Sequence, residues 1–206
     1  MNSTVKLHYV NRSLNLDKPK IFVFAKNELP TFDALKDGIA WKVIDKVGRE
    51  SACTFSFPIE TMVRASWDNG TCNTKSLSVC TGQRYIVTED DTGIVLLADG
   101  SATDTRSIDV VSDIHTHDGI SVDLYKDGRI LMSKRIVAYG QKATFELHPK
   151  LYWGVASEIQ EGEDLSSAVL NSDSFFEQNL EGITEATIGL YGNAQDGYMF
   201  KVESQS

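Results

Sequence analysis

Cysteine is scarce in this sequence, which has three cysteines among its 206 residues. They are Cys53, Cys72 and Cys80, and an odd number does not fit a closed disulfide framework. There is also no Cys-x-x-Cys pair to ligate zinc or to carry a redox reaction. The sequence therefore predicts three free thiols, with a Cys72–Cys80 bridge across a hairpin as the alternative.

Long apolar runs are missing as well. No segment stays apolar for the roughly 18 residues that a membrane-spanning helix needs. Residues 1–8 lack the apolar stretch of a secretory signal. We therefore expect a cytoplasmic protein, with release by a route that needs no signal as the alternative.

Positive charge is in the minority. Lys and Arg number 20 against 29 Asp and Glu, which gives a formal net charge of −9. Proteins that bind nucleic acids usually hold them with clustered Lys and Arg, and an anionic membrane attracts basic segments. The charge balance argues against nucleic acid as a partner and disfavours a membrane surface.

The motifs that identify many catalytic and cofactor sites are also absent. The sequence has no P-loop, no dinucleotide glycine fingerprint, no Gly-x-Ser-x-Gly elbow and no His-Glu-x-x-His. We expect no cofactor. Whether the chain is an enzyme stays open, because many active sites assemble from scattered positions.

Short β-like segments are what the sequence has in abundance. Most alternate in polarity or are rich in β-branched and aromatic residues, and most are bounded by Gly, Asp or Asn. At least ten strands at this spacing predict an all-β fold, an antiparallel β-sandwich with short helical insertions. The segments are 20–25, 40–44, 52–57, 62–67, 84–87, 94–97, 107–111, 120–125, 130–137, 143–147, 151–156, 186–191 and 198–202.

Local signals mark turns and two short helices. Asp127-Gly128 lies between two alternating segments and predicts a two-residue type I′ hairpin. Thr31 is positioned to cap a helix over 32–36 that stops at Gly38. A second helix is predicted to begin at 174–177, where Ser-Phe-Phe-Glu has the form of a capping box, with Gly182 downstream.

One internal similarity stands out. Residues 54–58 and 144–149 are β segments followed at similar spacing by another strand, and the two copies lie about 90 to 100 residues apart. A duplicated β unit would give pseudo-repeat halves 1–100 and 101–206, and chance similarity is the alternative. Because no low-complexity linker separates the halves, we expect one continuous domain over 1–206.

The segment 113–119 carries the sharpest local chemistry. On a strand, Asp113, His115 and His117 would share one face and could offer ligands to zinc, copper, iron or nickel. This set supports a metal-assisted enzyme as one hypothesis. A polar turn before the strand at Ile120 explains the same residues, and the Asp-Gly that ends the segment favours the turn.

Aromatic residues suggest a binding surface. Tyr152, Trp153, Tyr191, Asn193 and Tyr198 could stack on and hydrogen-bond a sugar or another small ligand. Trp and Tyr also prefer the interface of a lipid bilayer, and the same rings could instead form the core of a sandwich.

The order of short strands, with a Trp-bearing strand and a Tyr-Trp hairpin, loosely resembles small β-sandwich lectins and compact β-sandwich cytolysins. No diagnostic motif of either family covers a useful part of the chain, so no residues are carried over. We expect a soluble binding protein whose partner is a small molecule, a glycan, a lipid head group or another protein. A membrane-active, cytolysin-like protein and a metal-assisted enzyme centred on His115 and His117 are the alternatives.

Overall fold

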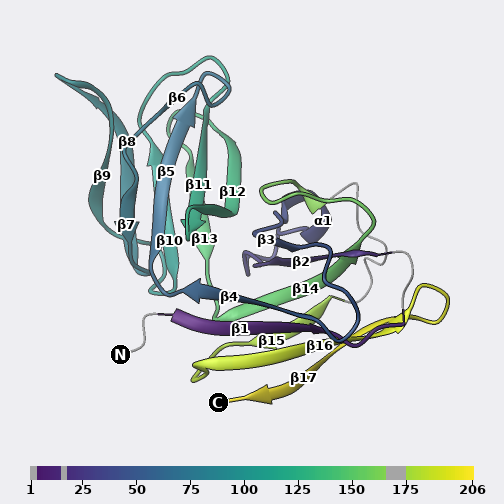
Figure 1. The fold of residues 1–206 in the computed structure, drawn as a ribbon. Coiled ribbons are helices and arrows are strands. Elements are labelled where there is room, and N and C mark those ends of the chain that lie inside the picture. Colours follow the sequence, from purple (N-terminus) through teal and green to yellow (C-terminus); the bar gives the residue numbers. More distant parts are fainter. Residues whose placement is uncertain (1–3, 15–17, 166–174) are drawn as a thin grey trace. The chain divides into compact units, whose positions relative to one another are not determined.

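A computed structural model describes residues 4–14, 18–165 and 175–206 of the chain. Strands make up 58% of the structure and helix 3%. The strands form four mostly antiparallel sheets, which confirms the predicted all-β, sandwich-like fold (Figure 1).

The chain divides into two compact units. Unit 1 contains Met1–Lys26, Asp33–Ile59 and Pro149–Ser206, and unit 2 contains Asn27–Phe32 and Glu60–His148. The elements, in chain order, are β1 (Thr4–Asn11), β2 (Lys20–Phe24), α1 (Ala34–Asp37), β3 (Lys42–Ile44), β4 (Ala52–Pro58), β5 (Thr61–Trp67), β6 (Cys72–Asn73), β7 (Leu77–Val79), β8 (Gln83–Asp90), β9 (Gly93–Ser101), β10 (Ser107–Ser112), β11 (Ile120–Lys126), β12 (Arg129–Val137), β13 (Lys142–Glu146), β14 (Lys150–Ala156), β15 (Phe176–Asn179), β16 (Glu185–Asn193) and β17 (Gly197–Gln205).

Unit 1 is a sandwich of two four-stranded sheets, ordered β17-β16-β1-β4 and β15-β14-β2-β3. Aromatic rings from both sheets meet between them. The Trp153 ring of β14 lies 5.8 Å from the Phe55 ring of β4 and 6.1 Å from the Phe200 ring of β17, measured between centroids. Alternate residues of a strand point to opposite faces, so these three rings mark the inner face of each sheet.

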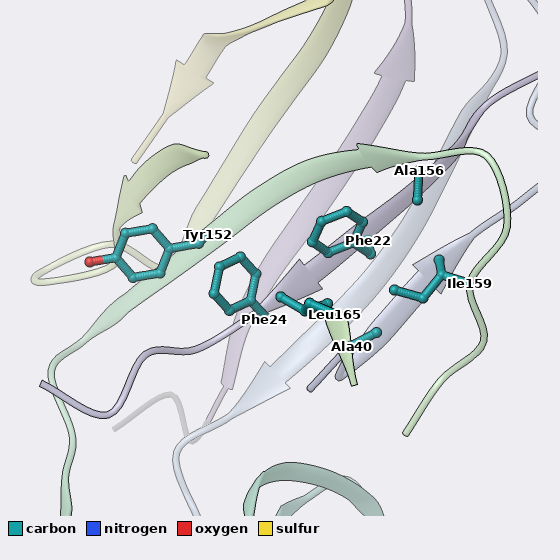
Figure 2. Packing of buried hydrophobic residues seen from close by; sticks show 7 residues of the cluster. All are labelled: Phe22, Phe24, Ala40, Tyr152, Ala156, Ile159 and Leu165. Carbon is teal, nitrogen blue, oxygen red and sulfur yellow. The ribbon is translucent and has the colours of Figure 1, made fainter. Parts of the chain in front are cut away.

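The second sheet of unit 1 is also covered on its outer face. Phe22 and Phe24 of β2 pack there with Tyr152 of β14, and Ile159 and Leu165 cover them (Figure 2). This explains why the whole of Ile21–Phe24 is buried instead of alternate residues only.

Gly154 shows how tightly this outer layer is packed. A Cβ at Gly154 would lie 2.2 Å from Cζ of Phe22. Only glycine leaves room for the Phe22 ring against β14.

Unit 2 is a second sandwich of two sheets. One has the order β13-β10-β8-β9, and the other has the order β12-β11-β5-β6, with β7 also paired to β5. Its core includes Val63, Val110, Leu124 and Phe145, each at most 1% exposed.

A buried carboxylate lies at the edge of the unit 2 core. Asp109 is 1% exposed and accepts hydrogen bonds from the hydroxyls of Thr103 and Thr144, at 2.6 and 2.7 Å, and from Lys142 Nζ at 2.9 Å. Burial by itself would raise the pKa of Asp109, but these hydrogen bonds outweigh burial and lower it to about 2.

The helix predictions are partly wrong. Helix α1 covers Ala34–Asp37, and its cap is Asp33, whose carboxylate accepts from the backbone N–H of Leu35 and Lys36. Thr31 is therefore not the cap, although Gly38 does end the helix as predicted.

The second predicted helix is instead strand β15, which pairs with β14; Ser174, its predicted cap, lies outside the described residues. Burial decides against the helix. The Phe175 ring packs 4.8 Å from Phe24, and the Phe176 ring packs 6.0 Å from Phe200 of the other sheet. Strand β1, whose alternation the sequence analysis overlooked, is central to its sheet.

The hairpin and thiol predictions are confirmed. Asp127 and Gly128 have φ values of 52° and 71°, and Lys126 pairs with Arg129, as a two-residue type I′ turn requires. Cys53, Cys72 and Cys80 are free thiols.

The turn gives a test of the hairpin. Gly128→Ala places a Cβ in the left-handed region, and we expect it to lower the free energy of unfolding by about 1–2 kcal/mol. Gly48, which does not have a positive φ, is the control, and Gly48→Ala should change stability by less than about 0.5 kcal/mol. Urea denaturation measures both, and equal stabilities would contradict the turn assignment.

The buried carboxylate gives a second test. Asp109→Asn should lower the free energy of unfolding at neutral pH by about 2–3 kcal/mol, because charged hydrogen bonds are lost. In the wild type this contribution is present above the ordinary Asp pKa of 3.8 and is lost as the pH falls towards about 2, since the folded state has the lower pKa.

The variant should therefore lose less stability than the wild type over that pH range. Exposed Asp91→Asn is the control. If the free energy of unfolding fell by the same amount with pH in the wild type and in Asp109→Asn, the role of the hydrogen-bond network would be contradicted.

Candidate functional site

Two of the predicted binding residues are buried in unit 1. Trp153 is 0% exposed and lies between the sheets, whereas Tyr152 is 5% exposed and lies on the opposite face of β14. The Tyr152 hydroxyl donates to Glu177 at 3.1 Å, and Lys26 Nζ lies 3.9 Å from its ring centroid. Both rings therefore contribute to packing and are closed to a ligand in this structure.

The other three predicted residues lie on the β16–β17 hairpin, also in unit 1. Tyr191 donates to Glu203 at 2.7 Å, and Asn193 accepts from the backbone N–H of Gln195 and Asp196 in the turn. Tyr198 pairs across the hairpin with Gly192. The structure brings these three onto one hairpin, separate from Tyr152 and Trp153 in the core.

Residues 113–119 form a loop between β10 and β11, as the turn interpretation expects. The His115 ring stacks on Tyr139 at 3.9 Å between centroids. The His117 side chain is 94% exposed and lies 2.7 Å from Asp118, while Asp113 accepts from Thr88 at 3.3 Å. In the described part of the chain, no group of three His, Cys, Asp or Glu side chains is arranged to hold a metal ion.

A feature that the sequence analysis missed is a basic pocket in unit 1. It has a volume of about 460 Å³ and is formed by the loops that follow β1 and β3. Three of its residues are cationic and exposed: Lys18, Lys46 and Arg49. The full lining is Asn11, Lys18, Pro19, Lys46, Val47, Gly48 and Arg49.

Asn11, the last residue of β1, fixes the two loops to each other. Its backbone N–H donates to Ser51 at 3.0 Å, and its carbonyl accepts from Glu50 at 2.7 Å. Its buried side chain donates to the carbonyl of Val47 at 2.8 Å and accepts from Ser13. The pocket floor is thus held by hydrogen bonds at both the backbone and the side chain.

Two of the three pocket cations have an uncommon backbone conformation. Lys18 and Lys46 have φ values of 48° and 59°, in the left-handed region that side chains other than Asn and Asp seldom occupy. Backbone conformations of this kind often occur at functional sites.

The three pocket cations differ from nearby basic residues in their ion pairing. Lys18, Lys46 and Arg49 form no ion pair with any carboxylate among the described residues. Nearby basic residues differ: Arg12 pairs with Glu203 and Glu50, and these hydrogen bonds raise its pKa. Lys20 likewise pairs with Glu158. Three cations that pair with no described carboxylate therefore line one pocket, although the chain has more acidic than basic residues.

Ammonium and guanidinium groups around a hollow are suited to an anion. Arg can bond two oxygens of a phosphate or carboxylate at once, and Lys acts as a compact charged donor. Overall composition conceals this site because the net charge of −9 averages over the whole chain. The local signal was Lys46-x-x-Arg49 next to a glycine.

A second hollow, of about 420 Å³, lies over His8, Glu185 and Ser206. His8 Nδ1 is 2.8 Å from Thr54 Oγ1, and His8 Nε2 is 2.6 Å from Glu185 Oε1. The hydrogen bond to His8 and the charge of Lys6 lower the pKa of Glu185. These side chains join β4, β1 and β16 across the open face of one sheet, so the row fits cross-strand bonding.

Comparisons with known proteins identify no relative. No family model, curated protein or solved structure matches the chain. Within the described residues, no helix has the length and apolar character needed to span a bilayer.

Asn11 provides a test of how the pocket is built. Asn11→Ala leaves the Val47 carbonyl without its side-chain donor, and we expect a loss of about 1–3 kcal/mol in the free energy of unfolding. Half-buried Asn193, whose side chain bonds within its own turn, is the comparison. Asn193→Ala should have a smaller effect in the same denaturation experiment, and the reverse order would contradict the role of Asn11.

Proposed function

We propose that this protein binds a small molecule through a phosphate or carboxylate group in the basic pocket of unit 1. The observation that carries the proposal is the gathering of Lys18, Lys46 and Arg49 around one hollow without carboxylate partners among the described residues. A bound anion would give hydrogen-bonded partners to three cations that form no ion pair with a described carboxylate.

The size of the pocket supports a small ligand. Its volume of about 460 Å³ falls in the range of roughly 300–1,000 Å³ typical of small-molecule sites. A polyanion such as nucleic acid would extend past the pocket onto a surface with an excess of carboxylates. The pocket therefore favours the small-molecule alternative among the partners considered from the sequence.

The overall negative charge does not prevent local anion binding. At physiological salt, exposed charges more than about 8 Å apart are largely screened from each other. The negative net charge carried by distant parts of the chain therefore has little effect on an anion bound beside Lys18, Lys46 and Arg49. Since the cations are exposed, affinity should fall as salt concentration rises.

Titration with inorganic phosphate, pyrophosphate and citrate tests the proposal, with glucose as a neutral ligand. We expect saturable binding of at least one anion at one site by NMR shift perturbation, centred on residues 46–49. The double variant Lys46→Gln, Arg49→Gln should weaken binding by about tenfold or more, because it removes two charged donors.

The matched control is Lys75→Gln, Arg106→Gln. It removes one Lys and one Arg, both exposed, from unit 2 and makes the same change in net charge. Equal weakening by both double variants would show a non-specific charge effect, and would contradict the site. Vesicles containing phosphatidic acid distinguish a lipid head group from a free phosphate as the ligand.

A further inference from the structure

The two units have the same strand order. In unit 1, the sheet β17-β16-β1-β4 has an antiparallel, a parallel and an antiparallel pairing in succession. In unit 2, the sheet β9-β8-β10-β13 has the same three pairings in the same order. The second sheets also correspond, since β15-β14-β2-β3 and β6-β5-β11-β12 are antiparallel throughout.

Residue registers match as well as strand order. Leu7 pairs with Phe55 in unit 1, and Ile108 pairs with Phe145 in unit 2. Ile108 follows Leu7 by 101 positions, and Phe145 follows Phe55 by 90. The offset of 90 continues without a gap into the next strands, where Val63 of β5 corresponds to Trp153 of β14.

The residues adjacent to the Leu7–Phe55 and Ile108–Phe145 pairs also correspond between the two units. One position along, Thr54 bonds His8 at 2.8 Å, and Thr144 bonds Asp109 at 2.7 Å. Each sheet also has a β-bulge at the same place, near Thr187 in β16 and near Arg84 in β8.

The loops that build the pocket have counterparts in unit 2 at the same offsets. Asn11 donates to Ser51 at 3.0 Å, and Ser112 donates to Gln141 at 2.9 Å. In the turn that follows, Ser51 donates to Gly48, and Gln141 donates to Ala138, both at 3.0 Å.

Residues with a left-handed backbone conformation also occupy corresponding positions in these loops. Lys18 and Gly119 have φ values of 48° and 72°, Lys46 and Ile136 have 59° and 60°, and Glu50 and Gly140 have 60° and 74°. Agreement at three such sites, together with pairing register and turn bonds, is more than two unrelated β-sandwiches would share.

We infer that the chain is a duplication of a unit of about 100 residues whose two copies have exchanged halves. The first copy contributes β1–β4 to unit 1 and β5–β9 to unit 2, while the second contributes β10–β13 to unit 2 and β14–β17 to unit 1. Each sandwich is therefore built from one half of each copy. The segment containing α1 is an insertion, since β2 and β3 are separated by more residues than β11 and β12.

The duplication makes the loops 113–119 and 136–141 of unit 2 the counterpart of the basic pocket. There, Gly119, Ile136 and Tyr139 occupy the positions of Lys18, Lys46 and Arg49, so the three cations have no equivalents. Ile136 is 74% exposed and β-branched, yet keeps the left-handed conformation of Lys46. Because Ile136 is exposed, packing of its side chain does not account for this strained backbone, whereas a shared origin of the two loops does.

Transplanting the pocket loop tests the inference. Residues 46–51 (Lys-Val-Gly-Arg-Glu-Ser) replace 136–141 in the full chain, and the control transplant uses 47–52, which shifts the register by one. In the in-register transplant, Val47 takes the place of buried Val137. In the shifted control, Gly48 takes that place and leaves the buried position without a side chain. We expect a single cooperative transition whose Tm loss is less than about half that of the control. Equal or greater loss in the in-register chain would overturn the duplication.

The second readout rests on the proposed function. For this readout the in-register transplant also carries Gly119→Lys, the counterpart of Lys18, so that all three cations are present. Inorganic phosphate or pyrophosphate, whichever binds the wild type, should occupy one site on the wild type and two on this transplant. One site on a folded transplant would overturn the equivalence of the two loop pairs. If the wild type binds neither anion, the proposed phosphate site fails while the Tm comparison still decides the duplication.

Discussion

Parallel pairing of β1 with β16 is the constraint on which unit 1 depends. It joins residues near the two ends of the chain, with Leu7 beside Ala186 and Tyr9 beside Ile188. All four of these side chains are buried, so the pairing also brings the inner faces of both strands to the same core. A parallel pair needs a long connection between its strands, and here that connection contains most of the chain.

The pocket depends on the same pairing through Asn11. This residue ends β1, is 4% exposed, and holds the loop after β3 by backbone and side-chain hydrogen bonds. The cations themselves remain exposed, where a charge is hydrated and stable without a partner. A buried, hydrogen-bonded floor with an exposed charged rim presents positive charge without placing it in the core.

Corresponding positions in the two units have taken different chemistry where burial allows it. His8 lies beside an open hollow and bonds Glu185. Its counterpart Asp109 is buried and saturated by two threonines and a lysine. In these loops, unit 1 has three cations that pair with no described carboxylate, and unit 2 has a His115–Tyr139 stack. Backbone geometry is common to both units, whereas side-chain charge differs. Packing of the core constrains the backbone, and exposed side chains can change with little effect on stability.

The sequence by itself determined the fold class, most strands, the Asp127-Gly128 turn and the free thiols, because these follow from local polarity, backbone preference and cysteine count. It also contained the repeated Thr-Phe segments at 54 and 144 that the registers match. Tertiary structure alone decided that Phe176–Asn179 is a strand, because the ring of Phe176 and that of the preceding Phe175 pack against faces built by distant residues. It alone decided that Trp153 is buried and that Lys18 joins Lys46 and Arg49. Burial and charge clustering arise from contacts between segments far apart in the chain, and no local pattern records which segments will meet.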